Sequence, residues 1–269
     1  MGQQPYVPPD YEQVSSSSQH VSGQMNQPSA RQDNRPQSSG GFGIFNTSIF
    51  SLQYYLQFFD VDSDQVLTRC IQALNPFDKR PFLSALDAEV GGDLAETPDM
   101  YGPFWICTTV VFVLFFASTL VGLLFSSWQG VKYEYKFDLL TGAAGLMYGY
   151  TVVVPTVLWL GLRYYSLGMH VGLLELICLY GYANVTWIPV AILSVSPLLG
   201  APTISNIIRW VFIVLGFAMS GMFVVRNVHR RLGEIAPTTA KVVPGFILVA
   251  HAGLALAVKF LFFGVEIKN

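Results

Sequence analysis

Charge is scarce in this chain of 269 residues. Only 12% of the residues are charged, against roughly 25% in an average soluble domain, while 52% are hydrophobic. The formal net charge of -2 gives no electrostatic basis for binding nucleic acid, so we expect no nucleic-acid partner. The composition therefore indicates a membrane protein.

Catalytic and metal-binding motifs are missing as well. The sequence contains no GxSxG, HExxH or P-loop motif, and its four histidines are scattered along the chain. The three cysteines, Cys70, Cys107 and Cys178, do not have the spacing of a metal site or a disulfide framework. We therefore expect no enzymatic activity, no catalytic residue, no metal site and no cofactor.

Targeting and lipidation signals are absent too. The N-terminus lacks the basic segment and apolar run of a secretory signal peptide. The opening MGQQPY departs from an N-myristoylation motif, because Tyr6 stands where that motif requires Ser or Thr and Pro5 precedes it. We expect any membrane attachment to come from spanning helices.

The first hundred residues are polar and divide into two parts. Residues 1–43 are rich in Gln, Ser, Pro, Gly and Asn, a composition that predicts a disordered cytosolic tail. Residues 44–98 predict an amphipathic cytosolic helical segment that ends in an acidic linker. Apolar residues in this segment recur at intervals of four and three, which places them on one helical face. These candidate partner-binding residues are Phe45, Ile49, Leu52, Leu56 and Phe59.

A second short helix is predicted after this face. Asp62 is suited to the N-terminal cap, and Asn75-Pro76 ends the helix. Leu67, Ile71 and Leu74 give this helix an apolar stripe of its own. Such faces need cover from the membrane bundle, from lipid headgroups or from another protein.

Long apolar runs dominate the rest of the chain. Residues 99–269 contain five predicted spans, each close to the ~20 residues that a bilayer core requires. The sequence therefore predicts an all-α polytopic membrane protein with five transmembrane helices and a partly disordered N-terminal cytosolic region. The predicted spans are 104–126, 139–162, 171–193, 204–225 and 242–263.

The loops predict the orientation of these spans. The loop between the fourth and fifth spans contains Arg226, Arg230, Arg231 and Lys241 against one acid, Glu234. Because cytosolic loops carry an excess of Lys and Arg, we expect this loop to be cytosolic. Five spans then place the N-terminal region in the cytosol and the C-terminus in a lumen.

Polar residues within the predicted spans are of interest, because charge inside a bilayer is costly. We expect Lys259 and Arg209 to snorkel toward a membrane surface. His251 and Asn184 lie near the middle of their spans and are able to hydrogen-bond, as a structural clasp or as part of a proton relay. Glu175 is either an interfacial carboxylate, held by an arginine or by helix-start amides, or a packing and partner determinant.

The stretch DMYGPFWIC, residues 99–107, joins the polar part to the first span. Asp99 suits the positive end of a helix dipole, and Pro103 is acceptable in a first helical turn. Gly102 permits a sharp helix start, while Tyr101 and Trp105 suit a membrane interface. We expect this stretch to begin a helix at the cytosolic membrane surface.

The same stretch resembles a known family signature. DMYGPFWI is similar to D-L-Y-G-P-F-W-I of the Yip family, five-span membrane proteins that interact with Ypt/Rab GTPases. ELICLYGYANVTWIP, residues 175–189, resembles that family's E-x-x-x-x-Y-G-Y-S-x-x-x-x-I-P, with Ala183 in place of its serine, and residues 54–76 resemble the pre-membrane segment of one branch. The family-motif residues are Asp99, Tyr101, Gly102, Pro103, Glu175, Tyr180, Gly181, Tyr182 and Pro189.

The resemblance implies a multi-pass Golgi or endosomal membrane protein that acts in vesicle traffic. It implies Rab-type small GTPases and other Yip-type membrane proteins as partners, the latter in hetero-oligomers. An alternative from another class is a small ion or solute transporter or channel. That alternative requires a continuous polar cavity, whereas the spans contain few polar residues and no obvious inverted repeat.

Overall fold

A computed structural model describes residues 56, 58–75, 77–78, 80, 82, 98–165, 172–195, 202–235 and 239–264. The predicted tail, most of the acidic linker and three of the candidate partner-binding residues, Phe45, Ile49 and Leu52, lie outside these ranges. The described part of the chain is all-helical, which confirms the predicted fold class.

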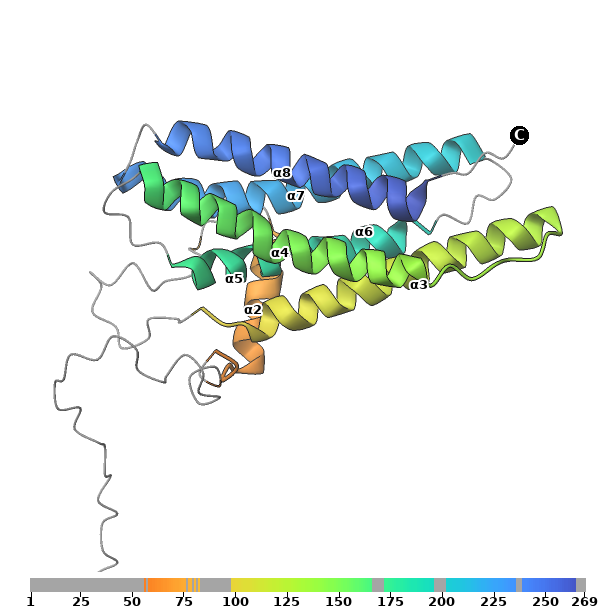
Figure 1. Ribbon diagram of the computed structural model, residues 1–269, viewed down its shortest axis with the longest axis horizontal. Coiled ribbons are helices and arrows are strands. Elements are labelled where there is room, and N and C mark those ends of the chain that lie inside the picture. The colour runs from red at the N-terminus through yellow and green to blue at the C-terminus, as the bar shows by residue number, and fades with distance from the viewer. Residues whose placement is uncertain are drawn as a thin grey trace, which may run out of the picture. The chain divides into compact units, whose positions relative to one another are not determined.

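Within these ranges, five helical segments are long and apolar enough to cross a membrane, as the sequence predicted. Figure 1 shows them running side by side as a bundle. The third span is composite, because a short 3-10 turn, η3, separates α5 from α6. The segments are α3 (Tyr101–Gln129), α4 (Asp138–Tyr165), α5 (Leu173–Ala183) with η3 (Asn184–Thr186) and α6 (Trp187–Leu193), α7 (Pro202–Ile235), and α8 (Thr239–Phe263).

The composite third span is the centre of the bundle. In its apolar window 78% of the residues are buried inside the protein, against 33% to 44% in the other four spans. It contacts α3, α4 and α7, while α8 packs on α4 and α7. The other spans therefore shield this one from lipid and leave their own outer faces apolar.

The fourth span differs from its prediction. We expected it to end at residue 225 and the basic residues after it to form a loop, but α7 continues as one helix to Ile235. Arg226 and Arg230 therefore lie on the last turns of a 34-residue helix. A helix of this length rises about 50 Å, well beyond the ~30 Å of a bilayer's hydrocarbon core.

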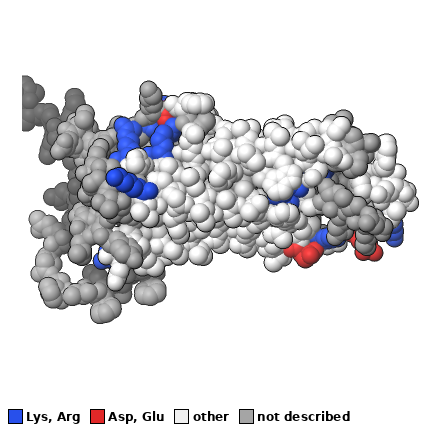
Figure 2. Space-filling model, turned by 90° about the horizontal axis from the view of Figure 1, so that it is seen from above, with Lys and Arg blue, Asp and Glu red and all other residues white. Residues whose placement is uncertain are grey.

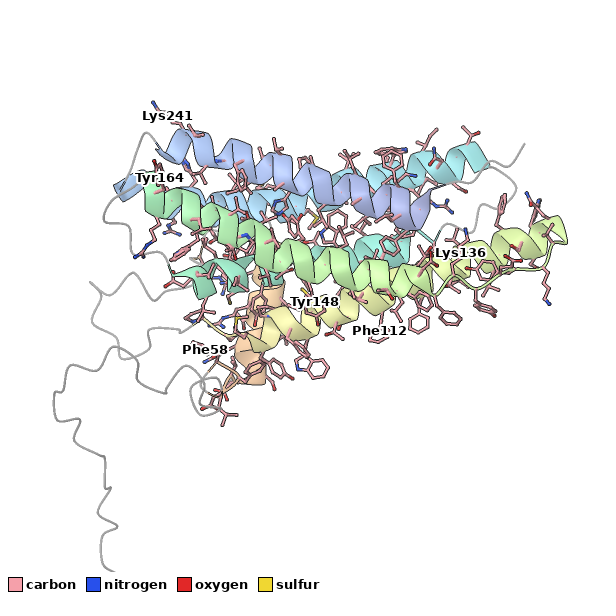
Figure 3. All side chains as sticks on the ribbon, viewed as in Figure 1. Phe58, Phe112, Lys136, Tyr148, Tyr164 and Lys241 are labelled. Carbon is pink, nitrogen blue, oxygen red and sulfur yellow. The ribbon has the colours of Figure 1, made fainter. Side chains whose placement is uncertain are left out.

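Charged side chains concentrate at the two ends of the bundle. Figure 3 places Tyr164 and Lys241 at one end and Lys136 toward the other. On the face seen in Figure 2, Lys and Arg gather at both ends and the surface between them is largely uncharged. We refer to the two as the Lys241 end and the Lys136 end. The pattern is that of a protein with an apolar belt between two polar boundaries.

Helix α2 (Ser63–Leu74) precedes the spans and runs across their direction (Figure 1). It begins after Asp62 and ends at Asn75, as predicted, although the Asp62 backbone carbonyl rather than its side chain accepts the first helical hydrogen bonds. The helix contacts α5, η3 and α7. Its position across the central span sets up the site described below.

The face that α2 turns toward the bundle is not its apolar stripe. Arg69, Gln72 and Ala73 are its buried residues, whereas Leu67, Ile71 and Leu74 are exposed. The bundle therefore does not cover this stripe, which leaves lipid headgroups or another protein of the three alternatives that we named. Hydrophobic periodicity finds the apolar side of a helix but does not tell which side a specific polar contact will bury.

Candidate functional site

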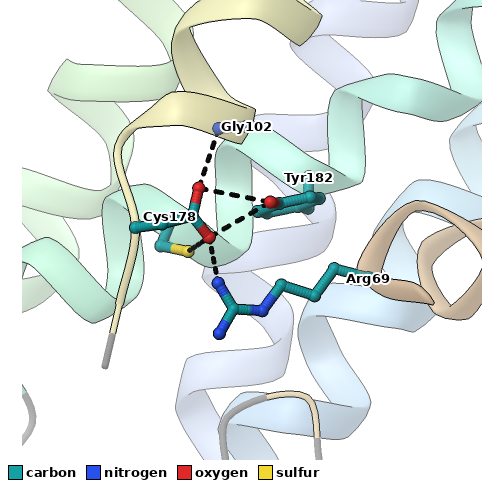
Figure 4. Close-up of polar contacts among 5 residues, drawn as sticks. Arg69, Gly102, Cys178 and Tyr182 are labelled. Atoms are coloured by element: carbon teal, nitrogen blue, oxygen red, sulfur yellow. Dashed lines mark hydrogen bonds and ion pairs between the residues drawn. The ribbon is translucent and has the colours of Figure 1, made fainter. Parts of the chain in front are cut away.

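The carboxylate of Asp99 lies at the meeting point of α2, α3 and α5. It is only 2% exposed and forms an ion pair with the guanidinium of Arg69 from α2. The Gly102 backbone N–H donates to Asp99 Oδ1 at 2.7 Å, and the Tyr182 hydroxyl donates to both carboxylate oxygens at 3.1 and 3.2 Å (Figure 4). The Cys178 thiol approaches at 3.8 Å. One carboxylate thus joins three helices.

Two glycines allow α3 and α5 to approach closely at the same place. A Cβ atom on Gly102 would lie 2.6 Å from Tyr182 Cε2, and one on Gly181 would lie 2.6 Å from the Cα of Pro103. Neither distance is possible for real atoms. Gly102 is therefore required for close packing rather than for the sharp helix start that we predicted, since Gly130 is the sole described glycine with positive φ.

We name these residues the motif clasp: Arg69, Asp99, Gly102, Gly181 and Tyr182. Four of the five belong to the two sequence motifs that resemble the Yip signature. The motifs lie about 80 residues apart in the chain, and the fold brings them into direct contact. Their spacing in the sequence is thus explained by one helix crossing.

The ion pair within the clasp is expensive to disrupt. Both side chains are almost completely buried, with exposed fractions of 3% for Arg69 and 2% for Asp99. Removing one partner of such a pair leaves an uncompensated charge and typically costs ~3–5 kcal/mol. The clasp therefore ties the orientation of α2 to that of the spans.

Two further contacts hold the segment ahead of α3 against the bundle. The buried Phe82 ring makes edge contacts with Tyr182 and Phe223 at 5.3 and 5.1 Å between ring centroids. The Met100 backbone N–H donates to the carbonyl of Phe58 at 2.9 Å, which holds that turn beside the start of α3. Together with Arg69, these contacts fix the pre-membrane segment at several points.

A second polar group lies deeper in the bundle. The Asn184 amide donates to Thr151 Oγ1 at 2.7 Å and lies 3.5 Å from the Cys107 sulfur, so η3, α4 and α3 meet there. His251 Nδ1 lies 2.7 Å from the Tyr150 hydroxyl. His251 and Asn184 both hydrogen-bond, as expected, but not to each other, because each binds a different neighbour on α4.

The predicted snorkelling of Lys259 and Arg209 is only partly correct. Lys259 does extend toward the end of α8, but its ammonium group donates to Asn206 Oδ1 at 3.0 Å and to the Phe263 carbonyl at 2.9 Å. Arg209 Nε donates to the Ser194 carbonyl at 3.2 Å. Both cations are buried within the protein, where they link the ends of α6, α7 and α8.

The other predicted site residues lie at separate places. Glu175 is in the first turn of α5 and half-buried, with its carboxyl group folded over Gly172. Tyr180 is fully buried against the rings of Tyr150 and His251, and Pro189 is half-buried in α6. The remaining ones are exposed, and these are Tyr101, Leu56 and Phe59.

Sequence reasoning missed Arg69 and Phe82. Arg69 lies on the face of α2 opposite its predicted apolar stripe, where a charged residue normally faces water. The available signal was Asp99 of the motif, an acid directly before the first predicted span, since ionisable residues drawn into a membrane domain are usually paired. Phe82 directly follows Pro81 in the sequence and has no periodic context that would predict its burial.

Cys70 follows Arg69 on α2 and is partly buried. Burial, together with the nearby Asp99 carboxylate, raises the pKa of the Cys70 thiol on α2, so that this cysteine is poorly nucleophilic. Among the described residues, no three His, Cys, Asp or Glu side chains come together as a metal site would require. The arrangement positions helices relative to one another.

These features define a class: a five-span helical membrane protein in which a pre-membrane helix is clasped to the central span. The sequence profile of the Yip1 domain matches residues 88–260, which contain the first four spans and all but the last three residues of the fifth. The chain belongs to the Yip1 domain family. Its members are known as membrane proteins of trafficking rather than as enzymes, so membership supports a role related to membrane trafficking.

Curated relatives agree with this assignment. Over 222 residues the chain is 31% identical to "Protein YIPF1 homolog" of Dictyostelium discoideum, covering 82% of this chain and 58% of that protein. It is 32% identical over 206 residues to "Protein YIP5" of Schizosaccharomyces pombe, with coverages of 76% and 78%. Against "Protein YIP5" of Saccharomyces cerevisiae it is 26% identical over 260 residues, with coverages of 90% and 80%. No solved structure matches significantly.

Proposed function

We propose that this protein is a non-enzymatic trafficking factor of Golgi or endosomal vesicle transport. In this proposal it binds Rab-type small GTPases on its cytosolic side and assembles with other Yip-type membrane proteins. Membership of the Yip1 domain family supports the trafficking role. The observation that carries the GTPase proposal is an exposed apolar segment held beside the start of the first span.

That segment contains Leu56 and Phe59, two of the candidate partner-binding residues. Their side chains are 52% and 45% exposed. Phe58 lies between them in the sequence. Its backbone carbonyl accepts the hydrogen bond from the Met100 N–H, which fixes this turn next to α3. A prenylated GTPase is brought to the membrane surface by its lipid, and exposed apolar side chains held at that surface offer it a contact.

The orientation in this proposal follows from charge. The Lys241 end carries Arg163, Arg226, Arg230 and Lys241, whereas the connection at the other end balances its lysines with acids. The positive-inside tendency therefore favours a cytosolic Lys241 end. On this basis residues 1–43 form a cytosolic tail, residues 44–98 the recruiting segment and residues 99–269 the membrane domain, with the C-terminus in the lumen.

The transporter alternative is less well supported. A transport path requires polar groups that are free to meet a solute along the bundle. In the described bundle, Asn184 is bonded to Thr151, and His251 to Tyr150, within a tightly packed interior. These contacts favour a scaffold held together by its own polar groups.

The proposal is tested by capture of GTPases from native membranes. We expect Leu56→Glu and Phe59→Glu to lower the recovery of prenylated, GTP-loaded Rab-type GTPases several-fold without changing membrane insertion. Gln65→Glu is the matched control, because it adds the same charge at an exposed polar position of α2. Unchanged GTPase recovery from correctly located variants would remove this segment from the binding site.

Association with other Yip-type proteins is tested in the same capture. We expect it to survive both glutamate substitutions, because the proposed contact is made by the spans and not by the recruiting segment. Loss of Yip-type partners together with the GTPase would instead indicate that one surface serves both.

A further inference from the structure

The outward stripe of α2 has no cover within the described protein. Leu67 is 60% exposed, and Ile71 and Leu74 lie on the same face one and two turns further along. Phe77, in the turn that follows, is 82% exposed and extends the stripe. Large apolar side chains gathered on one face of a helix normally mark a contact with a protein or a membrane.

The position of α2 decides between these two. The helix packs on α5, η3 and α7, which are all parts of membrane spans, and α5 is the half of the third span nearer the Lys241 end. The clasp holds the polar face of α2 against them through Arg69 and Asp99. The stripe on the opposite face of α2 therefore looks outward at a level where the neighbouring spans face lipid.

The surroundings of the stripe agree with a membrane interface. The first turns of α3 carry the exposed aromatic residues Tyr101, Phe104 and Trp105, the residue types that gather at headgroup level. The N-terminal end of α2 carries the exposed acids Asp62 and Asp64, which cannot enter hydrocarbon. Acids at one end and an apolar stripe along one face are compatible with a helix lying in the plane of the interface.

We propose that α2 is an interfacial helix, with the side chains of Leu67, Ile71, Leu74 and Phe77 inserted at the headgroup–acyl boundary of the bilayer. This surface is separate from Leu56 and Phe59, the side chains proposed to meet GTPases, and the inference does not depend on that proposal. Together, the clasp and the lipid contact hold α2 from both sides. The recruiting segment is thereby kept close to the membrane surface.

Spin labels test the proposal in the full-length chain reconstituted in phosphatidylcholine nanodiscs. Cys70 is replaced by Ser, and single cysteines are placed at positions 67, 71 and 77. Val157→Cys on the exposed face of α4 serves as the lipid reference. Gln65→Cys serves as the aqueous reference, because Gln65 is exposed in the first turn of α2 beside the acids Asp62 and Asp64. Accessibility to oxygen and to a water-soluble nickel chelate is measured at each site.

We expect labels at positions 67, 71 and 77 to be several-fold less accessible to nickel than the label at position 65, and to favour oxygen as the label at position 157 does. Nickel accessibility equal to that at position 65 would overturn the proposal. Nickel accessibility that disappears only when a GTPase is added would also overturn it, by assigning the stripe to a protein partner.

A second measurement needs no substitution. The wild-type chain is irradiated in nanodiscs that contain a phospholipid with a photoreactive group near the top of its acyl chains. We expect lipid adducts on the peptide that contains α2, as well as on the outer faces of the spans. Adducts on the spans with none on α2 would contradict the proposal.

Discussion

Gly181 and Pro103 show that residues of the family signature are required for close packing between helices. The two residues come from different motifs, yet there is no room for a single carbon atom between them. The same holds for Gly102 and the ring of Tyr182. A signature of this kind reflects the close packing of a helix crossing. Each of these glycines is required because the facing residue leaves no space for a side chain, and not because of its backbone angles.

Matched alanine substitutions test this reading. Gly181→Ala should destabilise the protein by about 1–3 kcal/mol, because a new methyl group must displace the Pro103 backbone. Gly149→Ala in α4 has nothing within 4 Å of its new carbon and should be neutral or stabilising by up to ~1 kcal/mol. Thermal unfolding in detergent measures both. Equal stability of the two variants would show that the crossing is loose.

At the level of elements, sequence reasoning was most successful for the spans. Their number followed from long apolar runs, which have few alternative explanations once they reach bilayer length. The end of α7 was misplaced, because a basic stretch was read as a loop although Arg and Lys are good helix formers. The inward face of α2 was not predictable, since Arg69 is buried by one partner 30 residues away and not by a pattern.

The three cysteines report on the packing of their elements. Cys70 on α2 is partly exposed, whereas Cys107 on α3 and Cys178 on α5 are buried. We expect a maleimide to modify Cys70 first and the other two only after unfolding. Because the Cys70 pKa is raised, its thiolate fraction is small at neutral pH, and its labelling should accelerate as the pH increases above 8.

Mass spectrometry of the labelled peptides measures this order. An exposed cysteine introduced as Gln65→Cys provides the control for reagent and pH, since its thiol should react faster than Cys70 at neutral pH. Early modification of Cys178 in the folded protein would show that the central span is accessible, contrary to its burial between α3, α4 and α7.

For the whole molecule, the proposed orientation makes a prediction about glycosylation. Asn46 and Asn184 both lie in N-x-S/T sequences. Asn46 should carry no sugar because it faces the cytosol, and Asn184 none because it is buried and bonded to Thr151. An acceptor site added after Asn269 should be glycosylated. Analysis of native protein for glycans checks Asn46 and Asn184, and the extended chain checks the added site. A sugar on Asn46 would reverse the orientation.

The central claim is that the motif clasp fixes α2, and with it the recruiting segment, relative to the spans. The most direct measurement is the distance distribution between spin labels at positions 65 and 164, on α2 and at the end of α4, with Cys70 replaced by Ser. Asp99→Asn removes the charge that pairs with Arg69, and Asp64→Asn removes an exposed acid of α2 as the control.

We predict one narrow distribution for the parent and for Asp64→Asn, and a broad or shifted one for Asp99→Asn, because α2 loses its fixed orientation. An unchanged, narrow distribution in Asp99→Asn would contradict the account, since α2 would then be held without the clasp.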